Sequence, residues 1–173
     1  MRQISKPNEG EYAPYAIMYL DLVPDDGLVL QHLQENWNAI RELVLSIPPE
    51  KRTWRFAEGE WTVQEILVHI LDTERIFCYR ALRFARKDDT VLAGFEQDGY
   101  VPPSRANERT IESILAEYAA VRQATLAFFE SLHDEARTRT GRVDENRVSV
   151  RALANVIAGH ELHHMNSLRE NYA

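Results

Sequence analysis

Residues 149–171 read SVRALANVIAGHELHHMNSLREN, and this stretch decides how the chain folds. Ser149 is a favoured residue for a helix N-cap, and no proline interrupts the residues that follow it. Side chains at three-to-four spacing form one stripe of a helix, and here they are Leu153, Ile157, His160, His164 and Leu168. The sequence therefore predicts a long helix whose core-facing stripe carries two imidazoles.

The imidazoles of His160 and His164 are the most informative feature of that helix. Residues four apart lie about 40° apart around the helix axis, so both rings can point at one ion. A polar side chain on a buried stripe costs free energy unless a partner satisfies it, and a metal ion satisfies two imidazoles at once. His163, about 60° from His160, could also reach a shared ion, but it drifts to the flank of the stripe. We therefore expect His160 and His164 to bind a metal.

Three other segments show the same helical period, at residues 26–47, 62–86 and 107–132. Pro48 ends the first segment, and Thr62 with Glu65 forms a capping box at the start of the second. Strand signals are poor throughout, and the connections between the helices read as polar loops, including residues 132–148. Four amphipathic helices of this length predict an all-α, up-and-down four-helix bundle in a single domain, residues 1–173.

Two segments fall outside the four helices. Residues 1–24 are rich in tyrosine and show no clear period, so we expect this N-terminal extension to pack on the bundle or on a partner subunit. Residues 87–106 hold glycines and prolines next to Phe95 and Tyr100. A long loop with its own aromatic side chains is often an active-site cover, so we expect residues 94–103 to close a pocket.

His69 is the best candidate for a third ligand, because catalytic zinc-type sites usually take three protein ligands and leave one position open. It lies on the apolar side of the second helix, in the N-terminal half of that helix. In an up-and-down bundle the second and fourth helices run parallel. His69 would then lie at a different position along the bundle axis from His160 and His164, unless helix offsets bring them level. His32 and His133 are expected to be ordinary hydrogen-bonded or surface residues.

Composition argues against several classes of function. The formal net charge of -7 argues against a general nucleic-acid-binding protein. No apolar stretch approaches the roughly 20 residues that a membrane span requires, and nothing near the N-terminus resembles a signal peptide. The single cysteine, Cys78, excludes an internal disulfide and fits a reducing cytoplasm. A basic run in the second helix is expected to be a solvated face, with a phosphate-facing surface as the alternative: Arg75, Arg80, Arg83, Arg86 and Lys87.

Residues 160–164 also match the zinc-metalloprotease pattern H-E-x-x-H, in which the glutamate activates a metal-bound water. The context argues against a protease. The longer pattern requires glycine and histidine where this chain has Ser167 and Glu170, and the substrate-binding strand expected before the helix is missing. Glu161 is therefore expected to lie on the helix surface, or to contact a metal-binding residue without binding the metal itself.

The chain resembles the DinB-like (YfiT-like) superfamily of four-helix-bundle metalloproteins over most of its length. The resemblance rests on residues 61–69 (WTVQEILVH), 72–77 (DTERIF) with Arg80, 94–100 (GFEQDGY) and 159–164 (GHELHH). In that superfamily one histidine of the second helix and two of the fourth bind a divalent metal. The resemblance therefore implies zinc or nickel held by His69, His160 and His164. The loop usually reads Gly-Phe-Asp, so Glu96 departs from the pattern, which matters if this carboxylate touches substrate.

The resemblance also implies an enzyme with a small-molecule substrate. Characterised relatives transfer a low-molecular-weight thiol to a small electrophile or isomerise maleylpyruvate, and other members are described as metal-dependent hydrolases. A divalent ion with an open position lowers the pKa of a bound thiol or water, so both chemistries fit. We expect thiol transfer, with hydrolysis of a small substrate or a non-catalytic stress-response module as the alternatives.

Several further expectations complete this interpretation. Asp72, Asp98 and Tyr118 are candidate pocket residues, with surface charge or ordinary core as the other interpretation of each. No general base is identified. The tyrosine-rich extension and the resemblance together favour a homodimer in the cytoplasm, without nucleic acid or membrane as a partner.

Overall fold

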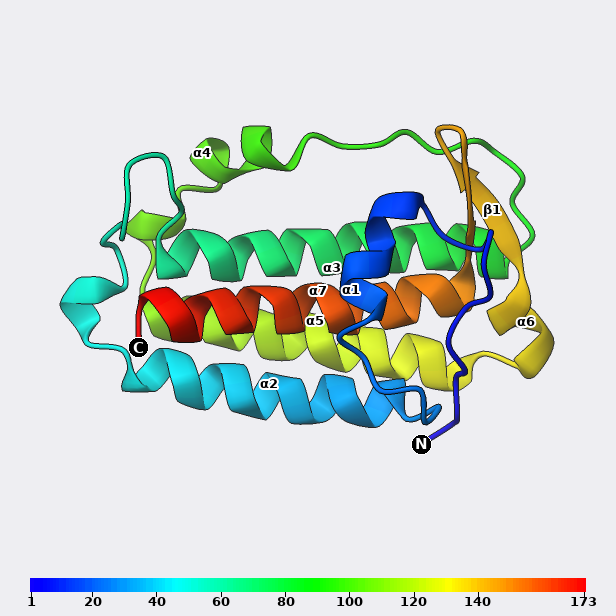
Figure 1. Cartoon of the computed structure of the whole chain (residues 1–173), viewed down its shortest axis with the longest axis horizontal. Coiled ribbons are helices and arrows are strands. Elements are labelled where there is room, and N and C mark those ends of the chain that lie inside the picture. Colours follow the sequence, from blue (N-terminus) through cyan, green and yellow to red (C-terminus); the bar gives the residue numbers. More distant parts are fainter.

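A computed structural model describes all 173 residues, and four long helices form the body of the protein (Figure 1). They are α2 (Val29–Ser46), α3 (Val63–Ala85), α5 (Ile111–Ser131) and α7 (Val150–Asn171). Thr62 caps α3 and Ser149 caps α7, each by accepting a hydrogen bond from a backbone N–H of the first turn. The helices match the four periodic segments of the sequence closely, so the predicted all-α four-helix bundle is confirmed. None of the helices combines the length and the apolar character needed to span a bilayer.

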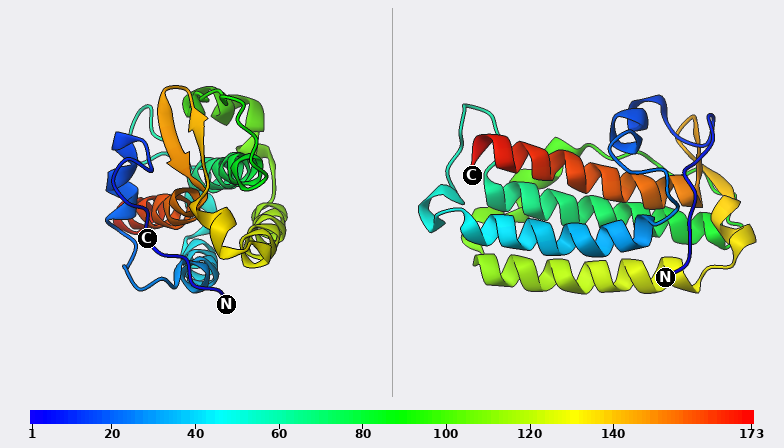
Figure 2. Two further views of the ribbon diagram at one scale, coloured as in Figure 1. Left: turned by 90° about the vertical axis from the view of Figure 1, so that its right-hand side faces the viewer. Right: turned by 60° about the horizontal axis from the view of Figure 1, so that its bottom comes forward.

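The four helices form a ring in which α3 packs against α7 and α5, and α2 completes the ring (Figure 2). α3 and α5 run parallel, because the connection between them returns along the length of the bundle (Figure 1). α3 and α7 run antiparallel: Tyr172 after α7 donates to Trp61 O before α3, and Arg139 before α7 donates to Ala85 O. This order differs from the simple alternation of directions that we expected.

The connections contain short elements of their own. A 3-10 helix, η2 (Pro49–Lys51), follows α2, and the crossing from α3 to α5 contains η3 (Gln97–Tyr100), α4 (Val101–Ser104) and η4 (Ala106–Glu108). Between α5 and α7, α6 (Asp134–Thr138) leads into an antiparallel hairpin of β1 (Thr140–Val143) and β2 (Asn146–Ser149). The prediction that residues 132–148 lack strands was wrong, because strands of this length are too short to show a period in the sequence.

The N-terminal extension lies against α7 of the same chain. Its 3-10 helix η1 (Pro14–Ala16) and its helix α1 (Ile17–Leu20) form one short helical segment, in which Leu20 is buried. Gly159 of α7 permits this close approach, since a Cβ at that position would lie 2.0 Å from Tyr19 O. The extension therefore has a packing role within a single chain.

A buried group of charges joins all four helices at the centre of the bundle. Arg122 of α5, which is 1% exposed, donates to both carboxylate oxygens of Glu74 on α3, at 3.1 and 2.9 Å. It also donates to both oxygens of Glu161 on α7, at 2.9 and 3.2 Å, and to Leu33 O of α2. Tyr118 donates to Glu161 as well. Burial raises the pKa of Glu161 and the charge of Arg122 opposes this, so the guanidinium makes the buried carboxylates tolerable.

Replacing Arg122 by methionine is expected to destabilise the fold by about 3–5 kcal/mol, because both buried carboxylates lose their positively charged partner. Urea unfolding followed by circular dichroism measures the change in the free energy of unfolding. The matched control is Arg105→Met, since Arg105 pairs with Glu108 on the surface, where ion pairs contribute little. Equal stability of the two variants would contradict this account of the core.

Candidate metal centre

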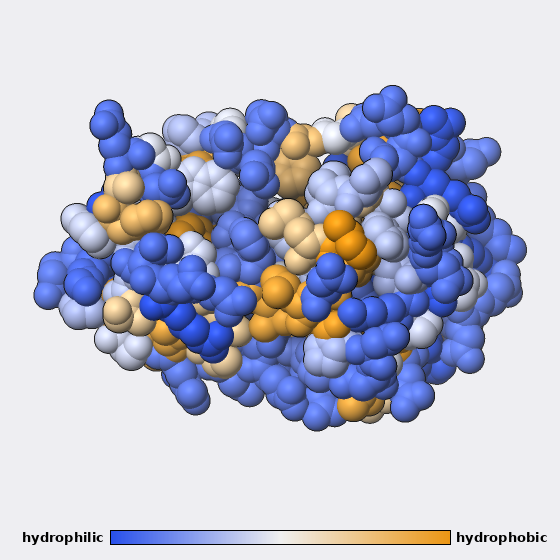
Figure 3. Space-filling view, viewed as in Figure 1, coloured by the Kyte–Doolittle hydropathy of each residue, from blue (hydrophilic) through white to orange (hydrophobic).

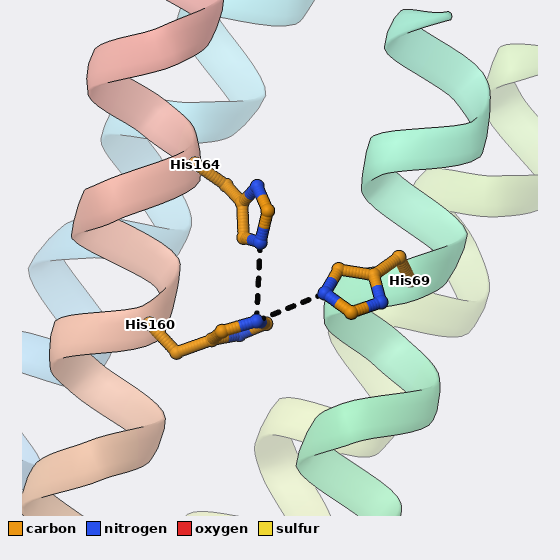
Figure 4. A group of neighbouring side chains, drawn as sticks. All are labelled: His69, His160 and His164. Atoms are coloured by element: carbon orange, nitrogen blue, oxygen red, sulfur yellow. Dashed lines mark hydrogen bonds between the residues drawn. The ribbon is translucent and has the colours of Figure 1, made fainter. Parts of the chain in front are cut away.

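Three imidazoles from α3 and α7 converge on one point (Figure 4). His160 Nε2 lies 2.9 Å from His69 Nε2 and 3.1 Å from His164 Nε2. One nitrogen from each ring lies within 4.8 Å of the other two. His69 and His160 are buried, and His164 is half-buried. The structure thus brings together the three residues that spacing in the sequence selected.

The antiparallel order of α3 and α7 places these imidazoles at one height. His69 lies early in α3, and His160 and His164 lie in the second half of α7, so the two regions meet only when the helices run in opposite directions (Figure 1). The expected difference in height was wrong because it assumed that these helices run parallel. Glu161 points to Arg122, and at 100° per residue both His160 and His164 then turn to one side of α7.

Burial keeps the imidazoles neutral. It lowers the pKa of His69 from 6.5 to about 4, against the opposing effect of the Asp98 charge. It also lowers the pKa of His164 to about 3, and repulsion from His69 and His163 adds to this effect. The pKa of His160 falls for the same reasons. Neutral imidazole is the form that binds a metal, so these rings do not first have to lose an imidazolium proton near neutral pH.

The three nitrogens fit a divalent metal. Zinc–nitrogen bonds of about 2.0–2.1 Å in tetrahedral geometry hold ligand nitrogens about 3.3 Å apart. The two short separations here, 2.9 and 3.1 Å, are close to that value. No carboxylate or thiol completes the group as a fourth ligand, so one position of a four-coordinate ion would stay open. Three protein ligands and an open position are typical of a catalytic rather than a structural site.

Aromatic rings enclose the imidazoles. The ring centroid of Trp61 lies 4.7 Å from that of His69, and Trp61 also stacks on His164 at 6.4 Å. Tyr19 of the N-terminal extension meets His160 edge-on at 5.3 Å. These rings restrict the access of water to the nitrogens, which strengthens electrostatic interactions at this point.

A cavity of about 390 Å³ opens beside His160. Three segments outside the four long helices contribute to its wall: the N-terminal extension, the crossing from α3 to α5, and the β1–β2 hairpin. The inner side is formed by side chains of α3 and α7, among them Phe77, Arg80, Leu153 and Val156. Its volume is in the range of small-molecule sites, so the cavity can present a small substrate to the metal centre. Phe95 of the predicted cover loop is part of the wall.

The candidate pocket residues have different positions. Asp98 lines a second cavity together with Trp61 and His164, so it lies near the imidazoles. Asp72 shares a small cavity with His69, but its carboxylate lies 3.6 Å from the guanidinium of Arg75. Of the two interpretations of Tyr118, pocket residue or ordinary core, the structure supports the core. The hydroxyl of Tyr118 is wholly buried in the core, where it satisfies Glu161.

Glu161 does not face the imidazoles either. Its carboxylate is fully buried and bonded to Arg122 and Tyr118, so it cannot act as the water-activating base of a metalloprotease. Its expected place on the helix surface was wrong, because α7 is surrounded by other elements at this level. His32 pairs with Asp26 at the surface, and His133 is exposed.

Sequence reasoning missed Thr73 and Arg80 as cavity residues. Both lie on the stripe of α3 that carries His69, four and eleven residues further along, and both line the cavity. Arg80 is only 6% exposed, so the expected solvated basic face was wrong for this residue, although Arg86 and Lys87 are exposed. The helical spacing from His69 was the signal that could have found both.

Cys78 is separate from the metal centre. Its thiol lies between α3 and α5, with Sγ 3.2 Å from Thr125 Oγ1. Burial raises the pKa of the thiol to about 12, so almost none of it is thiolate at neutral pH. Any thiol nucleophile at this site would therefore have to come from a bound small molecule.

Known proteins share this fold. The family model described as the DinB superfamily matches residues 32–168. The chain is similar to YfiT from Bacillus subtilis, described as a probable metal-dependent hydrolase with an unusual four-helix bundle topology. The TM-score is 0.76 at 14% identity, over 95% of this chain and 90% of that chain. It is also similar to a DinB-like protein from Bacillus subtilis, with a TM-score of 0.58 at 20% identity, over 82% of this chain and 87% of that chain. No curated protein matches the sequence.

Protein purified without a histidine tag or added metal is expected to carry stoichiometric divalent ion. His160→Ala removes the nitrogen that lies between the other two, so its metal content should fall to background. Elemental analysis by mass spectrometry measures the content. His163→Ala is the matched control, since His163 lies on the same helix outside the group. Equal loss of metal from both variants would contradict the assignment of ligands.

The Cys78 thiol is expected to react with Ellman's reagent about a thousandfold more slowly in the folded protein than in urea. The reason is the smaller fraction of thiolate when the pKa lies near 12 rather than near its ordinary value. Absorbance of the released thiol reports the rate. A fast reaction of the native protein would show that Cys78 is accessible and ionised. The protein could then supply a thiolate nucleophile of its own.

Proposed function

The chain belongs to the DinB superfamily, and we propose that it is a divalent-metal-dependent enzyme that transfers a low-molecular-weight thiol to a small electrophile. The observation that carries the proposal is the convergence of His69, His160 and His164 beside a cavity of small-molecule size. Zinc or nickel is the proposed ion. The cytoplasm is the proposed location, because it supplies low-molecular-weight thiols in reduced form.

Each part of the site has a role in this reaction. The three imidazoles hold the ion, which when bound lowers the pKa of a thiol and so supplies thiolate at neutral pH. Tyr19 and Trp61 limit the entry of water, and the cavity beside His160 binds the electrophile. The sulfur forms a bond to the electrophilic carbon, the leaving group departs with the electrons of its broken bond, and the thiol proton passes to solvent.

The surroundings of the imidazoles favour a thiol over water as the nucleophile. Hydrolysis uses a general base close to the metal to take a proton from water. Glu161, which would have this role in the protease pattern, is bonded to Arg122 and Tyr118 in the core instead. A thiol has a lower intrinsic pKa than water and needs less help to ionise, so three imidazoles and an ion suffice for it.

Hydrolysis of a small substrate is the second candidate, and Asp98 is the observation that favours it. Asp98 lines the cavity beside His164, and its charge acts on the pKa of His69, so it is a candidate for a base. YfiT, which shares the fold, is described as a probable metal-dependent hydrolase. A non-catalytic metal-binding module is the third candidate, and it differs from both in having no turnover.

The test is a panel of low-molecular-weight thiols with chlorodinitrobenzene as the electrophile, followed by absorbance of the thioether product. Conjugation is expected to require metal, to disappear in His160→Ala, and to persist in His163→Ala and in Asp98→Asn. Turnover of ester substrates without thiol, lost in Asp98→Asn, would favour hydrolysis instead. Stoichiometric metal with no consumption of any thiol or ester would favour the binding module and contradict the enzyme.

The homodimer stays a prediction. The tyrosine-rich extension was one reason to expect a partner subunit. It packs on α7 within one chain and lines the cavity, so it gives no separate reason for a dimer. Figure 3 shows apolar side chains near the centre of one face, beside α1. The extension exposes Ile17, Met18 and Leu22. A small-molecule substrate is likewise a proposal, and we propose no nucleic-acid or membrane partner.

A further inference from the structure

Arg80 is a buried cation without an anionic partner. Its side chain lies on the inner side of the cavity and the residue is 6% exposed. The guanidinium donates one hydrogen bond to a protein atom, from Nη2 to Ala93 O at 3.0 Å. It also lies 5.7 Å from the ring centroid of Phe77 and 5.6 Å from that of Phe95. Other buried guanidinium groups of this protein are paired, as Arg122 is with Glu74 and Glu161.

The two carboxylates that line the same cavity do not neutralise Arg80. Asp144 accepts a hydrogen bond from Gly94 N–H at 3.1 Å, which holds it on the hairpin side, and Glu96 is exposed. Neither forms an ion pair with the guanidinium, so its remaining donors are available to a ligand. Burial lowers the pKa of Arg80 although the charge of Asp144 acts to raise it, so Asp144 offsets only part of the cost of burying this charge. A bound anion would remove much of that cost.

The space between Arg80 and the metal centre is apolar. Phe77 lies between them, with its ring centroid 6.5 Å from that of His160. Leu153 and Val156 of α7 line the same side. The hydroxyl of Thr73 on α3 is also buried here without any hydrogen-bond partner, so it is available to a ligand as well. The cavity thus has a cation at one end and His160 at the other, and the side formed by α3 and α7 between them is mostly apolar.

We propose that Arg80 binds the carboxylate of a small ligand whose apolar body fills the cavity and whose reactive end faces His160. The proposal names the substrate class of the enzyme proposed above and rests on that function for the reactive end only. A guanidinium matches a carboxylate with two parallel hydrogen bonds, which a neutral alcohol of the same length cannot form. Arg80 is therefore a specificity-determining residue that selects acids over alcohols.

The alternative is that Arg80 only holds the cover loop in place through Ala93 O and the ring of Phe95. The two roles differ in their dependence on charge. A loop-holding role predicts no difference between charged and uncharged ligands of one size. A carboxylate-binding role predicts a preference that disappears when the charge is removed.

Binding of hexanoate and of hexanol to zinc-loaded, full-length protein separates these roles. Nuclear magnetic resonance titration measures both dissociation constants, and the arginine Nε–H signals identify the site. Hexanoate is expected to bind about tenfold more tightly than hexanol. Arg80→Gln is expected to remove the preference, Arg80→Lys to retain part of it, and Arg83→Gln to leave it unchanged. Arg83 is the matched control because it lies on the same helix and pairs with Asp88 outside the cavity.

Equal binding of the two probes, or no binding of hexanoate, would overturn the proposal. A preference that persists in Arg80→Gln would overturn it too, because hexanoate would then be bound by the metal or another cation. If Arg80→Gln does not fold, as melting by circular dichroism would show, folded Arg80→Lys decides instead. Partial or full loss of the preference supports recognition by the guanidinium, and an unchanged preference overturns it. A hexanoate preference in a protein that transfers no thiol would show that the proposed function has failed while the carboxylate site stands.

Discussion

Arg122 constrains how the long helices are rotated about their own axes, because its guanidinium contacts Glu74, Glu161 and Leu33 O together. With Glu161 turned to the centre, the helical step carries His160 and His164 to one side of α7. With Glu74 turned to the centre, the same step places His69, Thr73 and Arg80 on one stripe of α3. The candidate metal centre therefore depends on an ion-pair network that does not touch it.

The crossing from α3 to α5 has two effects on the site. By returning along the bundle it makes α3 and α7 antiparallel, which brings an early residue of one helix level with late residues of the other. The same crossing then passes over the imidazoles and contributes Phe95 and Asp98 to the two cavities beside them. One connection thus supplies both the alignment of the donors and part of their cover. Burial under that cover keeps the imidazoles neutral, as metal binding requires.

The helices and the pair His160 and His164 could be predicted because both depend on local spacing. His69 has no such interval to the pair, and it was chosen from the apolar side of its helix and from the family resemblance. The direction of the helices could not be predicted, since it depends on the path of a connection that has no period. The hairpin at Thr140–Ser149 was not predicted for the same reason, since its short strands show no period in the sequence. Arg80 was misjudged because a charged residue in a basic run normally lies at the surface, and only the tertiary fold buries it. For Tyr118 the sequence left pocket and core open, because it does not show that this helix face meets Glu161 rather than the cavity.

The metal centre and the walls of its cavity come from separate parts of the chain. The donors are fixed in the long helices, whereas much of the wall is built from the N-terminal extension, the crossing and the hairpin, which contribute little to the central ion-pair network. Insertions or substitutions in those peripheral segments can alter which molecules enter without disturbing the packing around Arg122. Changes confined to this rim can therefore reshape the cavity while the three imidazoles keep their positions.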